Sequence, residues 1–272
     1  MQWTTESSSH YDNLESKNIS ELLQAMNQED LSVPQAVQKA LPQIEAFLAA
    51  AMVRMRNGGK IFYIGAGTSG RLGVLDASEI PPTFGAPKDW FIGLIAGGDH
   101  ALRNPVEFAE DNPQQAWKDM QSYSIDKQDI VIGIAASGTT PYVIGGLKSA
   151  RAAGCLTGCI VCNIGSPVAA EAMFPMEIVV GPEFVTGSTR LKSGTATKLV
   201  LNMISTTLMI QMGRVKGNRM VDMHLANRKL VQRGTKMVME ALQLDEKTAN
   251  ELLKQQGSVR KAIDFFKTKN NI

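Results

Sequence analysis

The stretch KIFYIGAGTSGR, at residues 60–71, limits the folds open to this chain more than any other feature. Residues 61–64 form an apolar run with the length and β-rich composition of a buried strand. Gly65, Gly67 and Gly70 then permit a tight turn that brings the main chain close to a ligand. Thr68 and Ser69 add hydroxyl groups where the free N–H groups of a following helix would point. The stretch predicts a strand, a turn and a helix start, with either an anion site at the turn or a turn that only connects the two elements.

The G-x-G-x-x-G spacing of this turn also occurs in dinucleotide-binding folds, but its surroundings favour a smaller ligand. The turn is rich in hydroxyl groups, and Arg71 follows it directly. No clear acidic residue ends a second strand about 20 residues later, where a dinucleotide-binding domain would hold the ribose. We therefore expect the phosphate group of a small molecule at this turn.

Length and composition narrow the class of protein. A chain of 272 residues is long enough for one large α/β domain with helical additions. The net charge is only +2, and no block of Lys and Arg suggests a nucleic-acid partner. Residues 1–10 are polar and lack the apolar core of a signal peptide, and no run approaches the ~20 apolar residues of a membrane span. We expect a cytoplasmic protein with no membrane or nucleic-acid partner.

Cys155, Cys159 and Cys162 lie close together, which could suggest a metal site. Residues 156–161, however, have the pattern of a buried strand, in which alternate side chains face opposite ways, and no fourth ligand lies nearby. Buried thiols in a reducing compartment are the better interpretation, and we expect no bound metal.

The order of apolar and polar segments predicts an α/β fold. Strands are expected at residues 61–64, 90–96, 130–135, 156–162 and 177–180. Helical segments alternate with them, which indicates a parallel sheet covered on both faces, a three-layer α/β/α arrangement.

Helices are expected before, within and after this sheet domain along the chain. They are predicted at residues 19–26, 34–56 with a kink at Pro42, 71–78 ended by Ile80-Pro81-Pro82, 112–120, 190–212, 230–242, 245–255 and 258–267, with one helical turn at 105–109. A further helix is predicted after the turn at 136–141; it carries Val143, Ile144 and Leu147 and ends near Gly154. Residues 1–17 should be loosely ordered or docked on a partner subunit. The chain thus divides into a polar leader with helices (1–55), the sheet domain (56–220) and a helical subdomain (221–272).

Three turns rich in glycine and hydroxyl groups are each expected to open a helix. They lie at residues 67–70, 137–140 and 186–194, and Arg71, Arg190 and Lys192 lie in or beside them. In an open parallel sheet, ligands bind at the carboxyl ends of the strands, where the topology reverses. Ser and Thr also cap many helices without binding anything. Three such turns together nevertheless favour a phosphorylated small polar molecule.

These residues resemble the sugar isomerase (SIS) fold and, within it, the N-acetylmuramic acid 6-phosphate etherase family. The resemblance covers about residues 20–240 and is carried by GAGTSGRLG at 65–73, DASE at 76–79, PPT at 81–83, LIAGG at 94–98, AED at 109–111, GIAASG at 133–138, TPYV at 140–143 and LVLNM at 199–203. Two features depart from the family pattern. Thr139 stands where the family usually has an arginine, and the helical tail is shorter than usual.

The resemblance implies cleavage of the D-lactyl ether at C3 of N-acetylmuramic acid 6-phosphate, without a cofactor. It implies that Glu110 is the base that removes the C2 proton and that Glu79 is the acid that protonates the departing lactate. The residue pattern alone would not distinguish Glu110 from Glu107 or Asp111. The expected substrate- and phosphate-binding residues are Thr68, Ser69, Arg71, Ser137, Thr139, Thr140, Ser188 and Lys192.

Two other functions remain open at this point. A regulatory SIS protein that senses a sugar phosphate would keep the phosphate turns without the carboxylate pair. A sugar-phosphate isomerase would use similar proton chemistry at C2 without losing lactate. The apolar surface of the helices expected at 34–56 and 190–212 and the family resemblance both indicate a homodimer whose subunits help to close each other's sites.

Overall fold

The computed structural model describes residues 3–270, and their contacts form two compact units. One comprises the chain up to Ala77 together with Phe91–Ser205, and the other comprises Ser78–Trp90 together with the chain from Thr206 onwards. Each unit is described by itself.

The first unit is built on a sheet of five parallel strands in the order β2-β1-β3-β4-β5. Their bounds are β1 Ile61–Gly65, β2 Phe91–Ile95, β3 Ile130–Ile134, β4 Leu156–Val161 and β5 Phe174–Glu177. In the register, Ile61 lies opposite Phe91 on one side and Ile130 on the other. The predicted parallel sheet is confirmed, and four strands lie where the apolar runs predict them.

The fifth strand differs from its prediction. The sequence predicts a strand at residues 177–180, but the ladder is formed by Phe174–Glu177. Ile178 and Val180 are buried all the same, and the amide of Ile178 donates a single hydrogen bond to the carbonyl of Val161. Ile178 and Val180 thus have the apolar pattern of buried residues, and a residue can be buried without pairing in a strand ladder.

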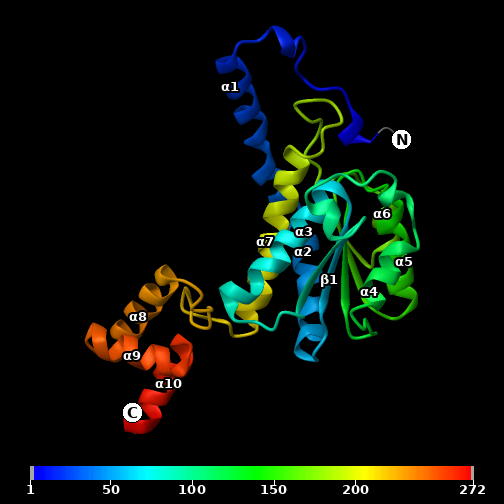
Figure 1. The fold of residues 1–272 in the computed structure, drawn as a ribbon. Coiled ribbons are helices and arrows are strands. Elements are labelled where there is room, and N and C mark those ends of the chain that lie inside the picture. The colour runs from blue at the N-terminus through cyan, green and yellow to red at the C-terminus, as the bar shows by residue number, and fades with distance from the viewer. Residues whose placement is uncertain (1–2, 271–272) are drawn as a thin grey trace. The chain divides into compact units, whose positions relative to one another are not determined.

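Helices cover both faces of the sheet, as the fold class predicts (Figure 1). On one face, α4 (Gln115–Gln121), α5 (Pro141–Ala152) and α6 (Pro167–Glu171) pack over a core that includes Phe62 and Ile64. On the other face, α2 (Ser32–Arg56) packs on β4 and β5. There, Gly158 approaches Phe47 of α2, and Tyr63 approaches Gly73 of α3 (Gly67–Phe84). Because side chains alternate along a strand, β1 contributes to both cores.

Helix α3 is longer than the sequence indicates. It was expected to end before Pro81, but it continues to Phe84 with Pro81 and Pro82 inside it. A proline removes its own N–H donor, yet its carbonyl still accepts, and the amide of Gly85 donates to the carbonyl of Pro81 at 2.9 Å. Prolines in a last turn therefore need not end the helix. Similarly, α2 continues through Pro42.

The described part of the N-terminal leader forms hydrogen bonds with its own chain, which corrects the expectation of a loosely ordered segment. The short helical turn η1 (Thr4–Glu6) holds Asn163: the hydroxyl of Thr4 and the amide of Thr5 both donate to its Oδ1, at 2.8 and 3.2 Å. The leader continues through η2 (Leu14–Ser16) to α1 (Ile19–Asp30), where Asn18 forms a capping box with Glu21. Hydrogen bonds, which apolar patterns do not reveal, fix this segment.

The second unit contains the helical tail. After α7 (Lys192–Gln211), a short hairpin of β6 (Val215–Lys216) and β7 (Arg219–Met220) precedes α8 (Arg228–Leu242), α9 (Glu246–Gln256) and α10 (Val259–Asn270). Asp245 caps α9 and Gly257 ends it, both as predicted, whereas the hairpin was missed. The three helices share a small core that includes Val238, Leu253 and Ala262. Among the described residues, no helix is long and apolar enough to cross a membrane.

Candidate functional site

The candidate site lies where the strand order reverses. Strands β1 and β3 are neighbours in the sheet, although β2 lies between them in the chain. The turns that follow them therefore start side by side at the carboxyl ends of the strands, and they lead to helices on opposite faces of the sheet. A cavity of about 390 Å³ opens there. It is lined by Ala66, Gly67, Thr68, Ser69, Glu110, Asp111, Ala135, Ala136, Ser137, Thr139, Thr140, Pro141, Thr189 and Gly194. Its size and its concentration of hydroxyl groups fit one small polar ligand.

The turn after β1 depends on its glycines. Gly67 has φ of +51°, a left-handed conformation that favours glycine. A Cβ atom at Gly70 would lie 2.7 Å from the carbonyl oxygen of Gly65, so the first turn of α3 can pack closely on the strand only without a side chain there. These glycines bring Thr68 and Ser69 to the cavity at the start of α3.

The turn after β3 brings a second set of hydroxyls to the same cavity. The Oγ of Ser137 lies 3.0 Å from the Oγ1 of Thr139, and the carbonyl of Ser137 accepts a hydrogen bond from Asn163 at 2.9 Å. Thr140 is the N-cap of α5 but makes no side-chain cap hydrogen bond, and Pro141 follows it. The positive end of α5 and these hydroxyls thus face the cavity without an anionic side chain capping the helix.

Glu110 comes from the segment between β2 and α4. A helical turn was expected at 105–109, but the turn η4 is formed by Ala109–Asp111. Phe108 just before it has φ of +57°, a left-handed conformation that a bulky side chain rarely adopts. Glu110 and Asp111 line the cavity and are exposed, whereas Glu107 does not line it. The structure therefore narrows the three carboxylates of the sequence pattern to two at this cavity.

The predicted site residues fall into three groups. The cavity lining includes Thr68, Ser69, Glu110, Ser137, Thr139 and Thr140. Arg71 lines a second cavity that adjoins it. Ser188 and Lys192 do not line the cavity, although Thr189 and Gly194 of the same turn do. Glu79 lies on α3, is exposed, belongs to the second compact unit and is not part of the cavity lining.

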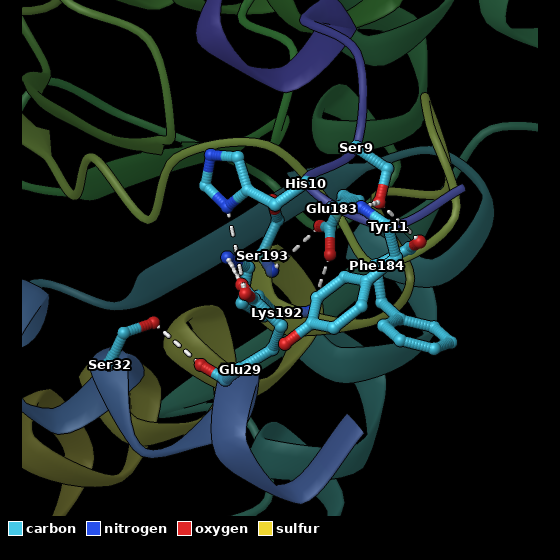
Figure 2. A network of polar contacts seen from close by, with 9 residues as sticks. All are labelled: Ser9, His10, Tyr11, Glu29, Ser32, Glu183, Phe184, Lys192 and Ser193. Atoms are coloured by element: carbon cyan, nitrogen blue, oxygen red, sulfur yellow. Dashed lines mark hydrogen bonds and ion pairs between the residues drawn. The ribbon is translucent and has the colours of Figure 1, made fainter. Parts of the chain in front are cut away.

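Lys192 is engaged elsewhere (Figure 2). Its ammonium forms an ion pair with Glu29 at 2.5 Å, and only 3% of its side chain is exposed. Partial burial raises the pKa of Glu29, but Lys192 and then His10 outweigh it, so the pKa of Glu29 lies below its ordinary value. The buried carboxylate of Glu183 accepts hydrogen bonds from the amides of Lys192 and Ser193, at 2.8 and 3.0 Å. The start of α7 is therefore capped by a carboxylate of the chain itself.

The cysteines are free and buried, as predicted. Burial raises the pKa of Cys155 to about 11, and it raises those of Cys159 and Cys162 to about 12. Within residues 3–270, no group of three or more His, Cys, Asp and Glu side chains could hold a metal ion.

Structural comparison defines the class of protein. A family profile described as the glucokinase regulatory protein N-terminal SIS domain matches residues 43–151. An E. coli protein that was solved with a ligand bound has a TM-score of 0.53 and 19% identity, over 74% of this chain and 97% of that one. Phosphoheptose isomerase from Neisseria gonorrhoeae has a TM-score of 0.51 and 17% identity, over 70% and 98%. At this identity the likeness shows the fold, and the fold is that of the SIS proteins.

Curated relatives define the family more narrowly. N-acetylmuramic acid 6-phosphate etherase of Bacteroides fragilis is 61% identical over 97% of this chain and 94% of its own length. The protein of the same name from Porphyromonas gingivalis is 59% identical over 97% of each chain. The chain therefore belongs to the N-acetylmuramic acid 6-phosphate etherase family. The predicted family and fold are confirmed, and neither the regulatory nor the isomerase alternative is favoured.

Proposed function

We propose that this chain cleaves the D-lactyl ether of N-acetylmuramic acid 6-phosphate, giving N-acetylglucosamine 6-phosphate and D-lactate. Membership of the etherase family over nearly the whole chain supports this activity. The observation in the molecule that supports it most is the juxtaposition of Glu110 with two hydroxyl-rich helix starts in one cavity. A base beside a phosphate site is the arrangement that proton abstraction from a sugar phosphate requires.

The reaction follows from the chemistry of the open-chain sugar. The C2 proton lies next to the aldehyde carbonyl, so Glu110 can remove it as a base. The ether oxygen on C3 then lies β to the resulting carbanion, and it leaves when an acid protonates it. Water adds at C3 of the unsaturated aldehyde and restores the hydroxyl group. Both proton transfers need only carboxyl groups, and no redox step occurs.

The 6-phosphate is proposed to bind at the hydroxyl turns. Ser137 and Thr140 are its main contacts, Thr139 and Thr68 assist, and Thr189 takes the place that the sequence suggested for Ser188. Hydroxyl donors, main-chain N–H groups and positive helix ends together can hold a dianion without a lysine. The proposed phosphate site therefore does not need Lys192, which does not line the cavity and is paired with Glu29.

Glu79 is proposed to act across a homodimer interface. It is exposed and does not line the cavity, so a carboxyl group reaching that cavity from the partner subunit would supply the missing acid. Large apolar side chains are also exposed on the first unit, including Ile19, Leu23 and Val53. Burial of such surface between two copies would stabilise a dimer. The buried, free cysteines are in keeping with a reducing cytoplasm.

The activity is tested by incubating the protein with N-acetylmuramic acid 6-phosphate in D₂O. We expect D-lactate in the medium and N-acetylglucosamine 6-phosphate that carries deuterium at C2, seen by NMR. Deuterium exchange without lactate would indicate isomerase chemistry instead. Binding of the sugar phosphate without either change would indicate a sensor.

The shared site is tested by mixing two inactive variants, Glu79→Gln and Glu110→Gln. If each site takes Glu110 from one chain and Glu79 from the other, a mixed dimer holds one intact site, and an equimolar mixture regains about a quarter of wild-type activity. Each variant mixed with itself is the control. No recovery after subunit exchange would mean that both carboxylates of a site come from one chain.

A further inference from the structure

A second cavity adjoins the proposed active site. Its volume is about 220 Å³, and Ala66, Gly67 and Glu110 line both cavities. Most of its remaining wall is apolar, formed by Ala96, Ala101, Pro105, Val106, Phe108 and Ala109. Glu110 therefore lies at the boundary between a hydroxyl-rich cavity and a largely apolar one.

Arg71 supplies the positive charge of this second cavity. Its Nε donates to the carbonyl of Leu102 at 3.0 Å, and its Nη2 donates to the carbonyl of Ala101 at 2.7 Å. A guanidinium group has five N–H donors, so these two bonds leave three. Within residues 3–270, no carboxylate forms an ion pair with Arg71. Two backbone contacts thus fix the orientation of the guanidinium group and leave three of its N–H donors without a hydrogen bond to these carbonyl groups.

The order of the reacting atoms relates the two cavities. The base acts at C2, and the bond that breaks is on C3, the adjacent carbon. C3 lies between C2 and the phosphate-bearing C6, so its substituent branches from the sugar chain directly beside the C2 atom at which Glu110 is proposed to act. The second cavity shares Glu110 with the first, and it is not lined by any of the hydroxyl residues Thr68, Ser69, Ser137, Thr139 and Thr140. A substituent on C3 could therefore enter it while the phosphate stays at the hydroxyl groups. The cavity's mixture of apolar wall and one guanidinium matches a substituent with a methyl group and a carboxylate.

On the basis of the proposed function, we infer that this second cavity is the lactyl subsite and that Arg71 binds the lactyl carboxylate. Guanidinium and carboxylate form paired, parallel hydrogen bonds, a geometry that an ammonium cannot reproduce. Glu107 also lines the cavity, but it is exposed, so solvent screens its repulsion of the substrate. This subsite makes Arg71 a specificity-determining residue, distinct from the phosphate contacts.

The competing interpretation is that Arg71 only braces the loop containing Ala101 and Leu102. Two substrates separate the roles: N-acetylmuramic acid 6-phosphate, and its lactamide analogue, in which a neutral –CONH₂ replaces the carboxylate. A charged hydrogen bond contributes about 1.5–3 kcal/mol, so the wild type should favour the acid over the amide by roughly 10- to 100-fold in kcat/KM.

In Arg71→Gln this preference should fall to within about threefold, because kcat/KM for the acid drops while that for the amide changes little. Arg71→Lys should recover only part of the preference. Arg103→Gln, the control at an exposed arginine that does not line the cavity, should keep all of it. A bracing role predicts instead that Arg71→Gln slows both substrates by the same factor, which would overturn the inference.

The wild type provides a test that does not depend on the variant folding. D-lactate should inhibit the wild-type enzyme competitively, and D-lactamide should inhibit at least about tenfold more weakly. Equal inhibition, or equal turnover of acid and amide by the wild type, would refute the lactyl subsite. Failure of the proposed function is distinct from both results, since the wild type would then release no lactate.

Discussion

The N-terminal ends of α5 and α7 have similar residues, but only the end of α7 is capped by a carboxylate of the protein. At α5, Thr140 makes no side-chain cap, and the hydroxyls of Ser137 and Thr139 face the cavity. At α7, Glu183 accepts the first amides, and Lys192 pairs with Glu29. A helix start attracts negative charge, which either a ligand or the protein itself can supply. We propose that the open start, at α5, binds the ligand, whereas the closed start, at α7, holds Glu29 of the N-terminal segment.

This comparison leads to a simple expectation. Changes around the open start should reduce activity and leave stability nearly unchanged. Changes at the closed start should reduce stability and leave the chemistry of the folded protein nearly unchanged. The predictions below test that separation, beginning with the largest expected effect.

Glu110→Gln is expected to slow lactate release and C2 deuterium exchange together by ~10²–10⁴, since loss of a general base removes the first step. Glu110 is exposed, so the thermal unfolding midpoint should stay within about 1 °C of wild type. Asp111→Asn, on the same turn, is the matched control and should retain most of the activity. If Asp111→Asn is the inactive variant, the base has been assigned to the wrong carboxylate.

Glu29→Gln is expected to lower the free energy of unfolding by about 3–5 kcal/mol, because it leaves the buried ammonium of Lys192 unpaired. The pKa of Glu29 is lowered in the folded state, so its contribution is present above the ordinary pKa and is lost as the pH falls through the folded value. Wild type and variant should therefore converge in stability at acid pH.

Glu240→Gln is the control for the Glu29 prediction. Its pair with Arg219 is exposed, so denaturant unfolding should show a loss of about 0–1 kcal/mol. Equal losses for the two variants would mean that the Lys192–Glu29 pair contributes no more to the free energy of unfolding than an exposed surface pair.

Ser137→Ala and Ser188→Ala compare the two starts directly. Ser137 lines the cavity, and removal of one hydrogen bond to a charged phosphate should raise KM about tenfold with little change in kcat. Ser188 does not line the cavity and should leave KM within about twofold. Equal increases in KM would restore the original prediction that all three hydroxyl turns bind phosphate.

The smallest expected effect concerns the rate at which the Cys162 thiol is alkylated. The carbonyl of Cys162 accepts a hydrogen bond from Thr4 of the leader, and its thiol lies beside Ser193 at the closed start. Burial raises the pKa of Cys162 to about 12, and the thiol should resist alkylation at pH 8 in the native protein. Labelling should become faster in Glu29→Gln if that variant loosens the leader. Rapid labelling of the wild type would show that the leader does not protect this thiol.

The sequence alone was sufficient for four of the five strands of the sheet, but it placed the fifth at residues 177–180 rather than at Phe174–Glu177. Continuous apolar runs such as Ile130–Ile134 can only be buried strands of a parallel sheet covered on both faces, and that requirement follows from local composition. The glycine spacing at Gly65, Gly67 and Gly70 likewise determined a close turn at the end of β1, because each conformation depends on the absence of a side chain. The family motifs identified Glu110, which lies at the cavity.

Tertiary structure decided which of the similar residues are available to a ligand. Lys192 and Arg71 are both cations next to hydroxyl turns. Lys192 pairs with Glu29, 163 positions away in the chain, whereas Arg71 donates hydrogen bonds to the carbonyl oxygens of Ala101 and Leu102. The leader attaches through Asn163, and no local pattern indicates that partner. Hydrogen bonds and ion pairs depend on positions and directions in space, whereas sequence patterns record mainly burial and backbone conformation. For this reason the sequence predicted where the turns would lie, and only the fold determined which of them remained open.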